Sequence, residues 1–402
     1  MLYKASLLLT ALIDLVGAFF KIQHYPNGGI LMQMSVVASL IFMILGLTDV
    51  YRNNTFKPSD KLIWTIGFIF LSWMPDSAIF QNTKREIQNK YNPMKTPLLF
   101  LFLLSTFVTV GQSRQVCFSF DDLPVVNYGV TDTLFHRQLT DKLVGSLARN
   151  HIPAIGFVNE QKMYENGKVS RFQLELLKSW VDNGLDLGNH TYSHPDYNIV
   201  SYRDFTADLL KGETLTRKLL QEKGKTLKYF RHPFLHVGPT KAKADSLDAF
   251  LKEHHYTVAP VTIDNEDYLF ALAYHRAYFQ KDTMLMKRIG ADFLTYMEAK
   301  MKYYEKQSIA LFGREIPQIM LLHASLLDSD YVDALVAIYR KNGYGFVNMD
   351  RALEDDAFQT PITVYGKWGI SWIDKWALSR GKKGEFFREE PLTPEYIHQL
   401  SK

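Results

Sequence analysis

Short apolar runs with the length of buried strands alternate with helix-like stretches from residue 116 to residue 349. The strand-like runs are residues 116–120, 154–158, 185–187, 229–234, 256–263, 319–322 and 345–349. The helix-like stretches between them include residues 139–148, 172–181, 205–220 and 332–339. Each parallel strand needs a crossover connection before the next, so this alternation is typical of a mainly parallel α/β domain. The sequence therefore predicts an α/β fold with seven strands.

Two polar patches come directly after strand-like runs. Asp121 and Asp122 follow the run that ends at Phe120, and His190 and His194 follow the run 185–187. In α/β barrels the carboxyl ends of the strands carry the chemistry. We therefore expect the four polar side chains to lie close together.

Two histidines four residues apart converge on one cation when a carboxylate from another strand and a water complete the ligand set. By itself this spacing is weak evidence, because two half-exposed histidines near a helix start give the same pattern. Here a carboxylate pair stands at a second strand end. The sequence therefore predicts a divalent metal site, with zinc as the expected ion, held by Asp122, His190 and His194.

The spare carboxylate of Asp121 indicates what such a site does. A bound divalent cation polarises an amide or ester carbonyl and lowers the pKa of an attacking water. Asp121 can accept the proton from that water if Arg231 keeps the carboxylate ionised and oriented. His323 can then protonate the leaving amine or alkoxide. Taken singly, these residues could be a turn cap, a surface ion pair and a buried histidine. Together they point to metal-assisted hydrolysis.

On these residues the chain resembles the polysaccharide deacetylases of the NodB-homology group, carbohydrate esterase family 4. The resemblance extends from about residue 115 to residue 353, and it implies a distorted (β/α)7-type barrel. It also implies that Asp121 is the general base and that the metal ligands are Asp122, His190 and His194.

Two further motifs extend the resemblance. Arg231 is similar to the arginine that orients the base, and the backbone after Pro233, at Phe234, is expected to help bind the oxyanion. Leu321 and His323 are similar to the last motif, whose histidine is the general acid. The resemblance therefore implies that Pro233, Phe234 and Leu321 contact the substrate.

The chain departs from the family pattern in two places. Leu123 stands where the family usually has glycine after the paired aspartates, and we expect it to add bulk at the mouth of the site. The aspartate that tunes the acid histidine is either Asp264 or Asp267, and Tyr268 would replace a nearby tryptophan. We favour Asp264 for a catalytic role, because it directly follows the strand-like run 256–263.

The deacetylase-like domain is expected to span residues 113–356, with a helical insertion at about residues 267–316. One interpretation of the insertion is a crossover that packs on the barrel. The other is that it forms one edge of a substrate groove, with Tyr274, His275 and Arg276.

An aromatic-rich extension follows at residues 357–402. Its Trp368, Trp372 and Trp376 are spaced by four, so on a helix their rings share a face. We expect this face to dock on the core in preference to forming a sugar-stacking platform.

The N-terminal quarter of the chain has the composition of a membrane region. Nine of the 46 basic residues and five of the 42 acidic residues fall in residues 1–96, which leaves 37 of each in the remainder. Positive charge beside apolar segments is a membrane-orienting pattern, not a nucleic-acid footprint. The apolar runs are residues 5–20, 29–48, 62–74 and 97–110, of which 29–48 is the best match to a transmembrane helix.

Residues 1–93 are therefore predicted to be a membrane region with two or three hydrophobic segments, or else a fused or misassigned start. Residues 94–112 have the charged start, apolar middle and small-residue end of a signal peptide, or they form a transmembrane segment. Both interpretations place the catalytic domain outside the cytoplasm. It is either anchored in the cell envelope, or secreted or periplasmic after cleavage near Gly111.

The expected function is hydrolytic removal of acetyl groups from N-acetylated carbohydrate, such as a polysaccharide or peptidoglycan-like chain. The alternatives are an O-acetyl esterase on xylan-like chains, a hydrolase of small cyclic amides, and a catalytically silent, membrane-anchored sugar-binding domain. A binding module needs no base and acid around a metal, which weighs against the last alternative. The sequence has no nucleotide-binding loop, and its single cysteine excludes a CxxC pair. No nucleotide or nucleic-acid partner is therefore expected.

Overall fold

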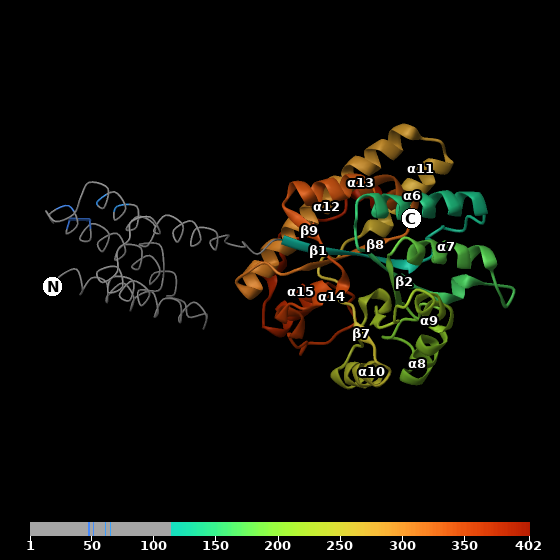
Figure 1. Cartoon of the computed structure of the whole chain (residues 1–402), viewed down its shortest axis with the longest axis horizontal. Coiled ribbons are helices and arrows are strands. Elements are labelled where there is room, and N and C mark those ends of the chain that lie inside the picture. Colours follow the sequence, from blue (N-terminus) through green and yellow to red (C-terminus); the bar gives the residue numbers. More distant parts are fainter. Residues whose placement is uncertain (1–46, 49–50, 52–60, 62–64, 66–113) are drawn as a thin grey trace, which may run out of the picture. The chain divides into compact units, whose positions relative to one another are not determined.

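The computed structural model of this chain describes residues 47–48, 51, 61, 65 and 114–402 (Figure 1). The hydrophobic segments predicted within residues 1–112 lie outside the described residues, apart from those five positions. Within the described part of the chain, no helix combines the length and the apolar character that a membrane crossing requires. The chain divides into two units at Val110, and the fold below is that of the second.

The centre of this unit is a seven-stranded sheet with the strand order β7-β6-β5-β2-β1-β8, to which β9 is added beside the start of β1. All of these neighbours pair in parallel. The strands are β1 (Arg114–Leu123), β2 (Ile155–Val158), β5 (Asp186–Asn189), β6 (Tyr229–Phe230), β7 (Thr257–Val258), β8 (Gln318–His323) and β9 (Tyr344–Phe346). Each falls on one of the seven predicted runs, so the expected parallel α/β fold is confirmed.

The sheet curls so that its two ends approach each other. After β7 the chain continues to Ile263, which forms a parallel bridge with Met320 on β8. The backbone N–H of Ile263 donates to the carbonyl of Ile319 at 3.1 Å, and Leu321 N–H donates to Ile263 at 3.2 Å. This curled parallel sheet is consistent with the distorted barrel that the family resemblance implies.

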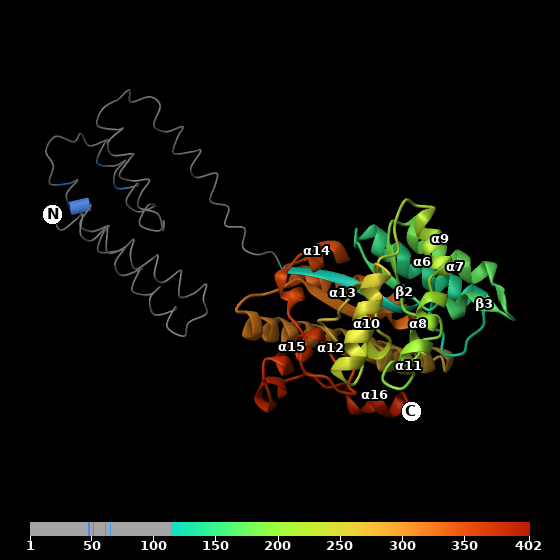
Figure 2. The same ribbon diagram turned by 90° about the horizontal axis from the view of Figure 1, so that it is seen from below.

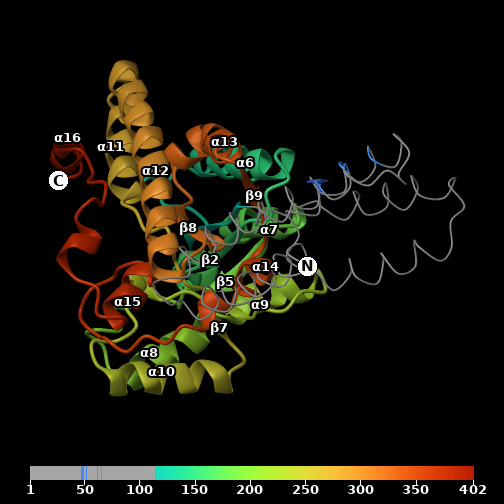
Figure 3. The same cartoon turned by 90° about the vertical axis from the view of Figure 1, so that its left-hand side faces the viewer.

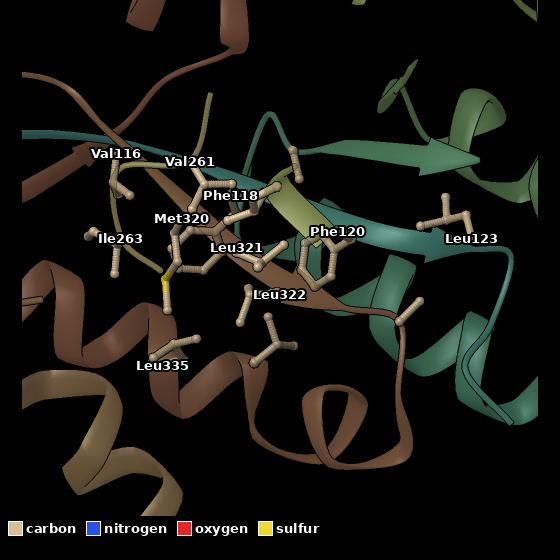
Figure 4. Packing of buried hydrophobic residues seen from close by; sticks show 14 of the residues in the cluster. Val116, Phe118, Phe120, Leu123, Val261, Ile263, Met320, Leu321, Leu322 and Leu335 are labelled. Carbon is tan, nitrogen blue, oxygen red and sulfur yellow. The ribbon is translucent and has the colours of Figure 1, made fainter. Parts of the chain in front are cut away.

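Alternation along β1 places its polar residues inside the curl. Val116, Phe118 and Phe120 are fully buried in the larger core, toward the covering helices, as Figure 4 shows. Cys117 belongs to a second buried cluster, which contains Phe157, Tyr229 and Ile319 from neighbouring strands. Successive side chains of a strand point to opposite faces. Ser119 and Asp121 therefore share the inner face with Cys117, and Asp121 reaches the carboxyl end of the curl.

Helices connect the strands and cover the sheet. They are α6 (Thr133–Arg149), α7 (Arg171–Asp182), α8 (Tyr202–Lys211), α9 (Thr214–Gln221), α10 (Lys241–Glu253), α13 (Leu326–Lys341) and α14 (Met349–Leu353). The single helix predicted at residues 205–220 is two helices, because the chain turns at Gly212. A Cβ on Gly212 would lie 2.4 Å from the backbone carbon of Thr191, so this close approach requires glycine.

Shorter elements complete the connections. A hairpin is formed by β3 (Tyr164–Glu165) and β4 (Lys168–Val169), and two short 3₁₀ helices, η1 (Glu160–Met163) and η2 (Pro233–Leu235), lie near strand ends. The two short helices contribute residues to the site described below.

Residues 267–316 form two long helices, α11 (Asp267–Phe279) and α12 (Thr283–Phe312). Figure 3 shows them lying side by side at the edge of the domain. The tail adds η3 (Asp356–Gln359), α15 (Trp372–Ser379), η4 (Gly384–Phe387) and α16 (Glu395–Leu400), and α16 packs against α11 (Figure 2).

The sequence predicted that the three tryptophans of the tail share one helix face, but only two of them lie on a helix. Trp368 precedes α15 and is 40% exposed, whereas Trp372 and Trp376 lie on the helix and are buried. Trp376 packs edge-on against Phe312 and Phe358. Docking on the core is therefore confirmed for Trp372 and Trp376. Trp368 does not share their helix face, because the helix begins at Trp372.

Candidate active site

The three predicted metal ligands gather at the carboxyl ends of β1 and β5. Oδ1 of Asp122 lies 3.7 Å from Nε2 of His190 and 3.6 Å from Nε2 of His194. One ligand atom from each residue lies within 4.8 Å of the others. Zinc held at about 2.0 to 2.1 Å in tetrahedral geometry separates its ligand atoms by about 3.3 Å. The spacing therefore fits one small divalent cation after minor side-chain adjustment.

His190 is oriented for this role by a backbone carbonyl. Its Nδ1 lies 2.9 Å from the carbonyl oxygen of Arg231, which assigns the proton to Nδ1 and directs the lone pair of Nε2 toward Asp122. Burial lowers the pKa of His190 to about 4, so the imidazole is neutral at pH 7. The amide of Asn159 also holds the His190 carbonyl, at 2.6 Å.

His194 returns to the site through a tight turn. Its φ of 58° and the φ of 69° at Thr191 are left-handed, and the His194 N–H donates to Oγ1 of Thr191 at 3.0 Å. Burial, and then the neighbouring His190, lower the pKa of His194 to about 4. Both histidines thus offer neutral nitrogen lone pairs, which is the form that binds metal.

Asp122 is held by a lysine that the sequence patterns did not single out. Lys162, on η1, donates from Nζ to the carbonyl oxygen of Asp122 at 2.5 Å and more weakly to that of Val125 at 3.4 Å. These bonds fix the backbone around Asp122, whose φ is 65°. Burial alone would raise the pKa of Asp122, but Lys162 and the two histidines hold it below its ordinary value.

Asp121 lies on the inner face, beside the predicted ligands, and is bound by a buried arginine. Nη1 of Arg231 is 3.3 Å from both carboxylate oxygens of Asp121, although only Oδ2 receives a hydrogen bond of good geometry. Oδ1 is buried and has no hydrogen-bond partner among the described residues. Oδ2 is the oxygen nearer the predicted ligands, at 3.7 Å from Nε2 of His190. Burial raises the pKa of Asp121, while Arg231 and His323 oppose that shift.

Arg231 is itself fixed on three sides. Its Nε donates to the carbonyl of Ala259 at 2.8 Å, and its Nη2 donates to Oγ of Ser119 at 2.9 Å. The guanidinium carbon lies 4.5 Å from the centre of the Phe157 ring. With no freedom to turn outward, Arg231 holds the Asp121 carboxylate in one orientation.

His323, at the end of β8, is bound by Asp267 and not by Asp264, so our preference for Asp264 was wrong. Nδ1 of His323 lies 2.8 Å from Oδ1 of Asp267, and the His323 N–H donates to Oδ2 at 2.9 Å. Burial alone would lower the pKa of His323, but the Asp267 carboxylate raises it to about 10. Asp264 instead lies near Lys300 and Lys375, and burial raises its pKa to about 7.

The residues expected to contact substrate differ in how exposed they are. Phe234 is 52% exposed, and its ring lies 4.4 Å from that of the predicted ligand His194. Tyr268, proposed in place of a tryptophan, is 47% exposed and lies 6.4 Å from the His323 ring. Pro233 and Leu321 are buried, unlike Phe234 and Tyr268.

Leu123 does not narrow the mouth of the site, contrary to expectation. Its side chain is fully buried and points at Gly156 on β2, where a Cβ would come within 2.2 Å of Leu123 Cδ2. The glycine therefore makes room for the leucine beneath the sheet surface.

Two of the insertion residues expected at a groove edge are engaged elsewhere. Tyr274 is buried and donates to Asp330, and Arg276 donates to the carbonyl of Leu400 in the tail. The third, His275, is buried and packs edge-on against the ring of Tyr128 at 5.1 Å.

Comparisons with known proteins found a family model and several solved structures that are similar to this chain. A family model described as polysaccharide deacetylase matches residues 110–251. The fold is similar to a family 4 carbohydrate esterase from Bacillus anthracis, at 18% identity, a TM-score of 0.37, and coverage of 60% of this chain and 83% of that one. The corresponding enzyme from Streptomyces lividans, solved with acetate, gives 19% identity, a TM-score of 0.36, and coverage of 60% and 96%. A peptidoglycan deacetylase from Bacillus subtilis gives 15% identity, a TM-score of 0.39, and coverage of 62% and 94%. No curated protein sequence matches this chain.

Proposed function

We propose that this chain, which contains a polysaccharide deacetylase domain at residues 110–251, is a metal-dependent hydrolase that removes acetyl groups from N-acetylated carbohydrate. The observation that carries the proposal is that a possible metal site and a possible general base lie side by side. A three-residue cluster able to hold a cation lies directly beside a further carboxylate, that of Asp121, whose Oδ2 is 3.7 Å from Nε2 of His190. A binding module has no use for that further carboxylate.

The residues at the site fit a resident divalent cation, with zinc favoured by two imidazoles and one carboxylate. We propose Asp122, His190 and His194 as its ligands. When bound, such a cation polarises the acetyl carbonyl and lowers the pKa of an attacking water.

Asp121 and His323 would divide the proton transfers. Asp121 would accept a proton at its carboxylate, with Arg231 keeping that carboxylate ionised and oriented. His323, whose Nδ1 is held by Asp267, would donate a proton from Nε2 to the leaving nitrogen. The exposed ring of Phe234 and its backbone N–H would receive the acetyl group beside His194.

The need for a proton donor favours amide substrates over esters. An amine is a poor leaving group until it is protonated, whereas an alkoxide needs less help. Asp267 keeps His323 protonated at neutral pH, since it raises the pKa of the histidine to about 10. This supports N-deacetylation over the O-acetyl esterase alternative.

The pH profile tests the assignment of Asp267. If protonated His323 is required, wild-type activity falls as the pH rises through the pKa of His323. Removing the carboxylate in Asp267→Asn lowers that pKa, so we expect the descending limb of kcat/KM to move down by about one to three pH units. Steady-state rates between about pH 6 and pH 11 measure the shift.

Asp264→Asn is the matched control, because Asp264 precedes Asp267 by three residues and does not bind His323. Its descending limb should stay at the wild-type position. A descending limb of kcat/KM that shifts in Asp264→Asn and not in Asp267→Asn would show that Asp264, and not Asp267, tunes His323.

A substrate panel tests the function itself. We expect the full-length protein to release acetate from acetylated chitin oligomers or peptidoglycan and to act poorly on acetylated xylan and small cyclic amides. Acetate can be measured enzymatically against a metal-stripped sample. Release from xylan alone would favour the O-acetyl esterase, and release from none of these would favour a silent sugar-binding domain.

The location of the enzyme remains a proposal. The positive charge excess among residues 1–96 and the apolar runs beside it support a domain held outside the cytoplasm by N-terminal membrane segments. Mass spectrometry of the native protein would distinguish cleavage near Gly111 from a continuous chain that includes residues 5–52.

A further inference from the structure

A row of aromatic rings leads away from the proposed general acid along α11. Its first ring is Tyr268, 6.4 Å from His323, and its last are Tyr278 and Phe279 at the end of the helix. Rings from the β1–α6 connection and from α6 lie between them. We call this row the aromatic ridge, and its members are Tyr128, Phe135, Tyr268, His275, Tyr278 and Phe279.

A hydrogen bond connects Tyr268 to Tyr128, and ring contacts connect Tyr128 to the end of α11. The hydroxyl of Tyr128 donates to the carbonyl of Tyr268 at 3.0 Å, and the Tyr128 ring lies 5.1 Å from that of His275. His275 is in turn 4.7 Å from Phe279. Phe135 of α6 lies 5.9 Å from Tyr278 and 5.8 Å from Phe279. Figure 1 shows the start of α6 beside α11, which agrees with these contacts.

Helical spacing explains why the rings form a line. Tyr268, His275 and Phe279 are separated by seven and four residues, so they lie on one face of α11. The 13 residues of α11 extend over about 18 Å at 1.5 Å per residue. The line is therefore several times longer than a single acetylated sugar needs.

The outer rings are exposed, while the rings beneath them are fixed. Tyr278 is 41% exposed and Phe279 is 52% exposed, although aromatic side chains of this size are usually more buried. His275 and Phe135 are buried and pack beneath them, which holds the exposed rings in place. A rigid row of rings loses little conformational entropy when a ligand binds.

We propose that the aromatic ridge binds the polysaccharide chain that carries the reacting sugar, over several sugar units on the His323 side of the site. This inference rests on the proposed function and specifies a polymeric substrate. A sugar ring presents a C–H face with hydroxyls at its rim. Phenylalanine and tyrosine suit that surface, because their rings are apolar and the tyrosine hydroxyl can form hydrogen bonds.

A membrane surface is the main competitor for this patch, because two exposed aliphatic residues, Leu134 and Met284, adjoin it in the sequence. The exposed charges beside the patch are mixed and do not select a bilayer. Lys281, Lys287 and Arg288 are exposed together with Asp282, Asp132 caps the neighbouring α6, and Arg288 pairs with Asp292 at 3.9 Å. The ridge begins at Tyr268, 6.4 Å from the His323 ring, which favours the substrate of that site.

Chain-length dependence tests the proposal. In the full-length double variant Tyr278→Ala/Phe279→Ala, we expect KM for an acetylated hexasaccharide to rise about tenfold, the effect of losing one or two aromatic contacts. KM for a disaccharide, which is too short to reach the end of α11, should change less than twofold. Leu392→Ala removes a more exposed apolar side chain from the tail and is the matched control, with both KM values unchanged.

The outcomes separate this inference from the proposed function. If the wild-type protein deacetylates both oligomers but the double variant keeps the wild-type ratio of KM values, the ridge is not a chain-binding surface. Loss of anionic vesicle binding in the double variant, with that ratio unchanged, would assign the patch to a bilayer and overturn the inference. If the wild-type protein releases no acetate from either oligomer, the proposed function itself fails.

Discussion

Replacing Asp121 with asparagine is expected to lower kcat by about 10² to 10⁴-fold while the metal stays bound. The amide keeps the size and most of the contacts of the carboxylate, but it cannot accept a proton. The carboxylate lies beside the predicted metal ligands, with Oδ2 at 3.7 Å from Nε2 of His190. Asp121 is not one of the three clustered ligand residues, so metal content should be unchanged.

Metal content and acetate release, measured on the same preparation, check both parts of this expectation. Asp186→Asn is a suitable control, because Asp186 lies at the opposite end of β5 and should affect neither measurement. Wild-type kcat in Asp121→Asn would show that another group is the base. Loss of metal in that variant would show that Asp121 is a ligand.

The double substitution His190→Ala/His194→Ala is expected to abolish metal binding and activity together. It removes both nitrogen ligands and leaves one carboxylate, and a single carboxylate cannot retain zinc against a chelator. We expect bound metal to fall from about one ion per chain to less than about one tenth. Elemental analysis after gel filtration against a chelator gives the ratio.

His151→Asn provides the comparison, because His151 is an exposed histidine outside the site whose φ is positive and suits asparagine. Its metal content should equal that of the wild type. Circular dichroism must show that the double variant remains folded. A folded double variant with a full complement of metal would place the cation elsewhere.

The sequence predicted the strands and the clustering of the candidate ligands because Asp122 and His190 stand at the ends of apolar runs. Asp122 lies at the carboxyl end of β1 and His190 directly follows β5, so the parallel arrangement brings them together without knowledge of the loops. The position of the second histidine, His194, depends on a turn with two left-handed residues, which the periodicity of the sequence does not predict. The role of His194 was implied by the family motif.

Two expectations failed for reasons of local backbone geometry. The register of β1 against β2 shifts between Phe120 and Leu123, so strand alternation does not carry through to Leu123, and its side chain lies against Gly156. The run that we extended to Ile263 is a strand only at Thr257–Val258. Asp267 lies next to His323 because Asn265 connects the two segments. The side-chain oxygen of Asn265 accepts from the Asp267 N–H, and its side-chain nitrogen donates to the carbonyl of Leu321.

No sequence motif contains Lys162, so its role was not predicted. It lies on a 3₁₀ helix 40 residues after Asp122 in the chain. Its hydrogen bonds go to backbone carbonyls, which every residue has, so the sequence does not reveal them. The aromatic ridge was hidden in a similar way. Its rings come from three separate segments, and only the fold places Tyr128 and Phe135 beside α11.

The most direct test is acetate release from an acetylated chitin oligomer by the full-length protein before and after metal removal. The account predicts no release by the chelated protein and full recovery when about one equivalent of zinc per chain is added. The same addition should not rescue the His190→Ala/His194→Ala variant. Undiminished acetate release by protein shown to contain no metal would contradict the account.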